Sequence, residues 1–115
     1  MKKRNIIKSN LIFDRIIKNN KSYRYKDYII YLERNDDFEY HFGLSVGKKV
    51  GNAVIRNKIK RQLKAIIDKN NYEKGFNCII IVRKGIINKS FQNMEKELNE
   101  VLIKLEIIKE KDDEK

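Results

Sequence analysis

Residues 47–64 have the sequence Gly47-Lys48-Lys49-Val50-Gly51-Asn52-Ala53-Val54-Ile55-Arg56-Asn57-Lys58-Ile59-Lys60-Arg61-Gln62-Leu63-Lys64. This stretch contains seven lysine and arginine residues and no acidic residue, and the acid-free part of the chain extends from Tyr40 to Ile67. Core packing does not require so much uncompensated charge, and cations crowded on a short segment repel one another unless a polyanion neutralises them. The stretch therefore predicts a surface that binds a polyanion.

The same stretch predicts an amphipathic helix over about residues 53–69, with Asn52 as its N-cap. On a helical wheel, the apolar residues fall within an arc of about 120° and are expected to pack on a sheet: Ile55, Ile59, Leu63, Ile66 and Ile67. The other side forms what we call the cationic face, with Arg56 and Lys58 at its edges: Arg56, Asn57, Lys58, Lys60, Arg61 and Lys64. An ordinary solvated surface is the alternative, but such surfaces usually mix charges to gain i,i+4 ion pairs.

Alternating patterns on both sides of this helix predict three strands. Residues 25–33 and 39–46 alternate in character and are expected to pair as a hairpin across a turn at 34–37. Residues 76–82 are apolar nearly throughout, which is typical of a strand at the centre of a sheet.

Helical spacing predicts two further helices. The first covers about residues 10–19, with Ser9 or Asn10 as its cap, and the last covers about residues 90–108, with Ser90 as its cap. The resulting order is αββαβα, with two strands joined through the basic helix. This order predicts an α+β fold, a two-layer sandwich in which a small mixed sheet packs against helices.

Length and composition indicate one domain. The 115 residues suffice for a single core, and we expect an RNA-binding domain at residues 1–109 followed by a frayed tail at 110–115. Hydrophobic residues make up 41% of the chain, which argues against disorder although 37% of residues are charged. No apolar run approaches the roughly 20 residues that span a bilayer, and the basic start is not a signal peptide. We expect a cytoplasmic protein with no membrane partner, in which the single Cys78 is a buried core residue.

The net charge of +11 is unevenly spread. Residues 86–115 contain six basic and eight acidic residues, which leaves 21 basic and eight acidic residues, net +13, for residues 1–85. A strongly positive body favours a nucleic-acid partner. A DNA-binding helix-turn-helix would need a second helix a short turn away, whereas both flanks of the basic helix are predicted strands, so we expect RNA and no DNA.

A resemblance to a known family rests on the run from Gly43 to Arg61. It resembles the signature of the bacterial ribonuclease P protein subunit, whose Arg-Asn-x-x-Lys-Arg helix corresponds to Arg56-Asn57-Lys58-Ile59-Lys60-Arg61. Four further segments resemble the family's basic N-terminus, the aromatic of its first helix, the tyrosine of its first strand, and its third strand with the basic residues that follow: Lys2-Lys3-Arg4-Asn5, Phe13, Tyr31 and Ile79-Ile80-Ile81-Val82-Arg83-Lys84. The resemblance covers about residues 2–85, and the last helix only by its pattern.

The resemblance implies a function and a division of labour. Proteins of this family bind a large catalytic RNA, and together they remove the 5′ leader from precursor transfer RNA. The RNA performs the hydrolysis with Mg²⁺ that it mainly holds itself, so the protein alone is expected to be inactive and to bind no cofactor tightly. The resemblance also implies an α/β sandwich whose crossover at the basic helix is left-handed, against the general rule.

The residues and the resemblance together predict two RNA-binding sites. The first should contact phosphates of the catalytic RNA: Lys2, Lys3, Arg4, Lys48, Lys49, Asn52, Arg56, Asn57, Lys58, Lys60, Arg61 and Lys64. The second, here called the leader groove, lies between the first helix and the sheet and is lined by Phe13, Tyr31, Tyr28, Arg83 and Lys84. Exposed aromatic rings beside a sheet can stack on bases. Simple core packing is the alternative for these rings, and Tyr28, on the opposite strand face, is the weakest candidate.

The chain offers no convincing catalytic set. His41 is the only histidine, so no histidine pair can act as acid and base. Asp36 and Asp37 lie in a predicted turn, where we expect them to stay solvated and bind no metal. These observations disfavour a free-standing metal-dependent nuclease. The remaining alternative is a general structured-RNA-binding or ribosomal-type protein, which would bind RNA without affecting the cleavage of precursor transfer RNA.

Overall fold

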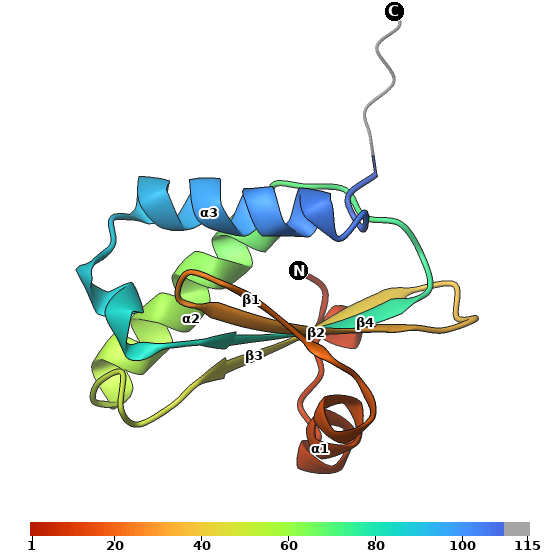
Figure 1. Cartoon of the computed structure of the whole chain (residues 1–115), viewed down its shortest axis with the longest axis horizontal. Helices are drawn as coiled ribbons and strands as arrows, with labels where there is room; N and C mark the ends of the chain where they lie inside the picture. Colours follow the sequence, from red (N-terminus) through yellow and green to blue (C-terminus); the bar gives the residue numbers. More distant parts are fainter. Residues whose placement is uncertain (110–115) are drawn as a thin grey trace, which may run out of the picture.

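The computed structural model describes residues 1–109, in which helices surround one four-stranded sheet (Figure 1). The elements are η1 (Lys3–Asn5), α1 (Asn10–Asn19), β1 (Ser22–Tyr25), β2 (Tyr28–Arg34), β3 (Tyr40–Val46), α2 (Ala53–Ile67), β4 (Phe76–Val82), η2 (Lys84–Asn88) and α3 (Phe91–Lys104). The predicted α+β class is confirmed, while the predicted tail at 110–115 lies outside the described residues. No helix in the described part is long and apolar enough to cross a membrane.

The strand order is β1-β2-β4-β3, with β4 antiparallel to β2 and parallel to β3. The central position of the apolar strand is therefore confirmed, but the predicted hairpin between β2 and β3 is wrong. The reason is that β4 lies between them and pairs along its whole length with both strands, so that β2 and β3 do not meet. β3 and β4 are joined through α2, as predicted; the left-handed sense of this crossover stays a prediction.

The hairpin partner of β2 is β1 and not β3. The predicted strand at 25–33 is interrupted by a two-residue loop, Lys26 and Asp27, so that Tyr25 pairs with Tyr28. Lys26 has a positive φ of 51°, a conformation that tight hairpin loops require and that non-glycine residues seldom adopt. This loop lacks the glycine that is typical of such turns, so the alternating pattern predicts one continuous strand.

Helices lie on both faces of the sheet (Figure 1). α2 and α3 cover the face that carries Phe42, Cys78 and Ile80, and together they form the main core. α1 packs on the opposite face, in a second cluster centred on Ile16 and Ile79. The two-layer arrangement is thus extended by a third, partial layer, because the second face of β4 is also apolar and needs cover.

The helix caps follow the sequence closely. The side chains of Ser9, Asn52 and Ser90 each accept a hydrogen bond from the backbone amide three residues later, at 3.4, 3.0 and 3.1 Å. α3 ends at Lys104, earlier than predicted, because Glu106 adopts a left-handed conformation with φ of 62°. The chain then turns back and pairs with the segment after α2, which the helical spacing of the last apolar residues did not indicate.

The N-terminal segment lies along the outer edge of β3. The Asn5 side chain donates to the backbone oxygen of Tyr40 at 2.7 Å, and the Ile7 amide donates to the oxygen of Phe42 at 2.8 Å. The Met1 ammonium group forms an ion pair with Asp68, which follows α2. These contacts hold the basic segment at residues 2–4 near the C-terminal end of α2.

Candidate nucleic-acid interface

Helix α2 is anchored on the sheet by one side and presents cations on the other. Ile59, Leu63, Ile66 and Ile67 are buried as predicted, but Ile55 is 40% exposed and does not pack on the sheet. Ile55 belongs to the first turn of the helix, and its side chain lies over the backbone of Gly51, which precedes the helix. The residues of the cationic face are exposed or half-buried: Arg56, Asn57, Lys58, Lys60, Arg61 and Lys64.

The cations of residues 47–64 have no carboxylate partners among residues 1–109. The ion pairs in this part of the chain involve Arg4, Arg15, Lys26, Lys69, Lys89 and the N-terminal amine. Within the N-terminal basic segment, Arg4 contacts Glu39 at 2.6 Å, but both side chains are well exposed and such pairs contribute little to stability. The structure therefore leaves the charge of α2 and its preceding segment available for an external anion.

A second group of cations lies at the N-terminal end of α2. Because β3 and β4 are parallel, the segments that follow them leave the sheet at the same end, where Val46 pairs with Val82. Lys48 and Lys49 follow β3, and Arg83 and Lys84 follow β4; all four are exposed. Sequence reasoning assigned the last two residues to the leader groove, but the structure groups them with the start of the basic helix. Asn52, also exposed, uses its side-chain oxygen to cap this helix.

A hollow of about 370 Å³ connects the cationic face with the leader groove. It lies at the outer edge of β3, and we call it the edge hollow. Lys60 and Lys64 line it from α2, Lys8 from the N-terminal segment, Ser45 from β3, and Phe13 from α1. The two predicted sites therefore meet, although they belong to opposite faces of the sheet.

Of the three aromatic rings predicted to line the leader groove, Phe13 and Tyr31 lie on the face of the sheet that α1 covers. Phe13 is half-buried and rests on Gly43, where an added Cβ would lie 2.7 Å from the ring. Tyr31 is also half-buried and packs in the same cluster. The prediction for Tyr28 is wrong, because its even position on β2 points it into the main core, where it is fully buried and donates to the oxygen of Met94 at 3.4 Å. Burial raises the pKa of this tyrosine.

Comparison with known proteins agrees with this geometry. A sequence model of the family described as Ribonuclease P matches residues 1–106. The chain belongs to the ribonuclease P protein family. It is 40% identical over 107 residues to the ribonuclease P protein component of Mesoplasma florum, with 90% of this chain and 97% of that protein covered. The structure of the Staphylococcus aureus RNase P protein superposes with a TM-score of 0.81 at 29% identity, covering 91% of this chain and 98% of that one. The Thermotoga maritima RNase P protein gives a TM-score of 0.71 at 28% identity, covering 78% and 87%.

The Mg²⁺ that the resemblance implies is expected to be held mainly by the RNA, and the described residues show no cluster of metal-ligating side chains. Divalent magnesium prefers oxygen ligands, mainly carboxylates and phosphates. Residues 1–109 contain no cluster of three or more histidine, cysteine, aspartate or glutamate side chains that could hold a metal. Asp36 and Asp37 are exposed in the turn after β2, far along the chain from the cationic face. The absence of a tightly protein-bound Mg²⁺ therefore stays a prediction.

Arg56 differs from the other residues of the family's basic helix. Its side chain is half-buried, and its Nε atom is buried without a hydrogen-bond partner in the described part of the chain. An unsatisfied buried donor costs about 1–3 kcal/mol. Arg56 is thus the residue of the cationic face whose guanidinium is most closely packed against the fold.

A chain of polar contacts crosses the sheet beside α1 and was not predicted. Arg15 of α1 donates two hydrogen bonds to Glu33, at 2.7 and 3.1 Å, and these lower the pKa of that carboxyl. Asn77 donates to Glu33 at 2.9 Å, and its side-chain oxygen lies 2.9 Å from Nδ1 of His41. His41 is thus a structural residue on the face of the leader groove. Glu33, His41 and Asn77 have odd numbers on their strands, and this shared face is the signal in the sequence that indicates their proximity.

Proposed function

We propose that this chain is the protein subunit of a ribonuclease P and acts in the maturation of transfer RNA 5′ ends. It binds the catalytic RNA subunit through the cationic face and the leader of precursor transfer RNA through the leader groove. The observation that carries this proposal is the set of cations at residues 47–64, held on a packed helix without carboxylate partners in the described part of the chain. Together with family membership, it favours a polyanionic RNA as the partner.

The contact with the catalytic RNA is mainly electrostatic. Each lysine or arginine that neutralises a phosphate releases a condensed counterion, which favours binding at low salt. The free backbone amides at the start of α2 add to the attraction, because a helix N-terminus carries partial positive charge. Lys48, Lys49, Arg83 and Lys84 are near this end, whereas Lys2, Lys3 and Arg4 extend the contact toward the other.

The leader follows the groove beside α1 and passes the edge hollow. One side of Phe13 lines this hollow, and its other side packs on the sheet. A base can therefore stack on the ring without disturbing the fold. Stacking of one base on an aromatic ring contributes about 1–3 kcal/mol. Lys60 and Lys64 line the same hollow and are placed to neutralise a phosphate of the strand.

The chemical step belongs to the RNA, and Mg²⁺ held mainly by the RNA supplies the Lewis acid and the activated water. The protein neutralises phosphates that would otherwise need metal ions, so it lowers the Mg²⁺ concentration at which the RNA is active. We expect the protein alone to cleave nothing. Membership of the ribonuclease P family supports this assignment.

Single-turnover cleavage of precursor transfer RNA by the cognate catalytic RNA tests the proposal. The protein should stimulate cleavage at low Mg²⁺ and have little effect at high Mg²⁺. Absence of stimulation at every Mg²⁺ concentration, together with tight binding of the RNA, would favour a general structured-RNA-binding protein. Cleavage by the protein without RNA would overturn the division of labour.

A further inference from the structure

A small apolar hollow of about 230 Å³ lies between α2 and η2, at the basic end of the molecule. Its buried part is formed by Ile59 and Ile86, and its rim by Ile55 and Ile87, which are 40% and 46% exposed. Val54, beside Ile55, is 76% exposed. The two isoleucine side chains on the rim of this hollow are only partly covered by the fold, so their exposed apolar surface points to a ligand that covers it.

Cations border this apolar hollow on the side of α2. Lys58 lines it directly, and Lys48, Lys49 and Lys84 are exposed at the same end of the sheet. None of these lysines forms an ion pair with a residue in the range 1–109. A ligand that fits must therefore combine negative charge with a compact apolar part.

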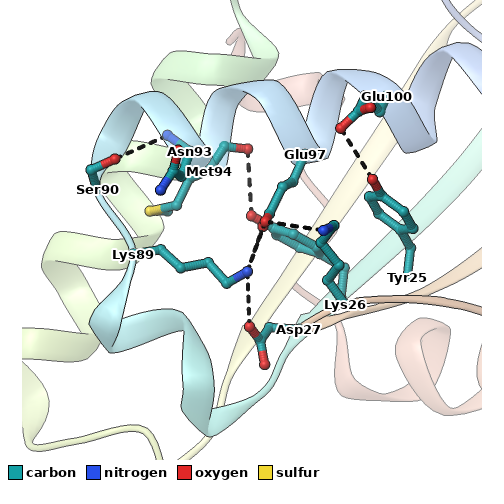
Figure 2. Close-up of polar contacts among 10 residues, drawn as sticks. Tyr25, Lys26, Asp27, Lys89, Ser90, Asn93, Met94, Glu97 and Glu100 are labelled. Atoms are coloured by element: carbon teal, nitrogen blue, oxygen red, sulfur yellow. Dashed lines mark hydrogen bonds and ion pairs between the residues drawn. The ribbon is translucent and has the colours of Figure 1, made fainter.

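The lysine on the opposite wall of the apolar hollow is neutralised by carboxylates and firmly held. Lys89, which forms part of this wall, places Nζ at 2.7 and 2.8 Å from the carboxylate oxygens of Glu97 and at 3.1 Å from Asp27 (Figure 2). The backbone oxygen of Asp27 accepts a hydrogen bond from the Arg83 amide at 2.8 Å, which fixes the entrance to η2. A wall that is already in place loses little entropy when a ligand enters.

We propose that the apolar hollow receives one unstacked nucleobase of the bound RNA, whose flanking phosphates lie against Lys58 and the neighbouring lysines. An unstacked base has apolar faces, polar edges and a charged backbone on both sides, and these match the isoleucine rim, the Gln62 amide at the wall and the unpaired cations. A second protein molecule would have to place acidic groups over Lys58 and apolar groups in the hollow. This inference rests on the proposed function, since it assigns a base-binding site to the surface that contacts the RNA.

Two substitutions separate base binding from phosphate binding, using the full chain and the cognate catalytic RNA over a series of salt concentrations. Ile87→Ser removes apolar surface from the rim, and it should weaken RNA binding about tenfold while leaving the slope of log K against log salt unchanged. Lys58→Ala removes a phosphate contact, and it should make that slope about one unit shallower. Ile55→Ser, on the facing rim, should reproduce the effect of Ile87→Ser.

Ile103→Ser is the matched control, because Ile103 is 62% exposed near the C-terminal end of α3 and does not line the apolar hollow. It should leave RNA affinity unchanged, and thermal unfolding should show all variants folded. In chemical probing of the RNA, one nucleotide should be protected by the wild-type protein and by Ile103→Ser, and should become reactive with Ile87→Ser. Wild-type affinity of Ile87→Ser, or a self-association of the protein that this variant abolishes, would overturn the inference. Failure of the wild-type protein to bind or stimulate the RNA would overturn the proposed function instead.

Discussion

The two long helices on the same face of the sheet differ in the acids they carry: α3 carries Glu95, Glu97 and Glu100, whereas α2 carries none. The carboxylates of α3 pair with lysines from neighbouring segments: Glu97 contacts Lys89, which also contacts Asp27 (Figure 2), and Glu95 contacts Lys69 at 2.7 Å. Along α2 and the segment before it, seven lysine and arginine residues have no such partner in the described part of the chain. In a chain with 27 basic residues, the abundance of lysine indicates little, whereas seven cations on one helix and the segment before it, with no acid among them, support the proposed anion-binding surface.

The difference has an energetic meaning that experiments can separate. Paired cations around α3 stabilise the contact between α3, η2 and the β1–β2 loop, so their loss should reduce the free energy of unfolding. Unpaired cations on α2 repel one another, so their loss should reduce RNA affinity and leave stability unchanged or slightly higher. Variants that affect both properties equally would break the comparison.

The largest expected effect on stability comes from Glu97→Gln. This change leaves the ammonium group of Lys89 half-buried with Asp27 as its only remaining carboxylate partner in the described part of the chain. We expect a loss of about 2 kcal/mol in the free energy of unfolding, measured by urea denaturation, because hydrogen bonds to charged groups contribute about 1.5–3 kcal/mol. The salt dependence of RNA binding should stay that of the wild type. Glu106→Gln, an exposed position outside the network, is the control, and an equal loss there would show that Glu97 has no special role.

Arg61→Ala should have the converse effect. Arg61 is exposed on the cationic face, and its loss should make the slope of log K against log salt about one unit shallower and weaken binding by about 1 kcal/mol near physiological salt. Its free energy of unfolding should not fall. Lys96→Ala removes one charge from an exposed position on α3 and should leave the slope unchanged. A wild-type slope for Arg61→Ala would remove this residue from the RNA contact.

The contrast between these two surfaces was only partly predictable from the sequence. The cationic face could be predicted because it depends on residues within one helix, whose spacing fixes their directions. The network around Lys89 could not, because Asp27, Lys89 and Glu97 come from three separate segments and meet only through the strand order. The same limit explains the wrong hairpin: the alternation in β2 and β3 fixes their faces but not their neighbours.

The aromatic candidates show the same limit at the scale of single side chains. Strand alternation correctly placed Tyr28 and Tyr31 on opposite faces, but the sequence did not say which face α1 covers. The edge hollow could not be predicted either, because part of its lining comes from the N-terminal segment beside β3. That segment pairs with β3 through a single bridge, which leaves no periodic pattern in the sequence.

The smallest expected effect concerns Glu33→Gln and the pH dependence of folding. Hydrogen bonds from Arg15 lower the pKa of Glu33 in the folded protein, so the contact stabilises the fold above the unfolded value of about 4.3 and is lost as the pH falls through the lower, folded value. The melting temperature of the variant should therefore lie below that of the wild type at pH 7, and the two should converge in acid. Asp36→Asn, at an exposed turn position, should show no such convergence, and a constant difference for Glu33→Gln would contradict the role of Arg15. The melting temperature of Arg61→Ala should follow that of the wild type throughout this pH range, because no carboxylate in residues 1–109 pairs with Arg61. The pH dependence thus distinguishes Arg15, which stabilises the fold, from Arg61, which is proposed to bind RNA.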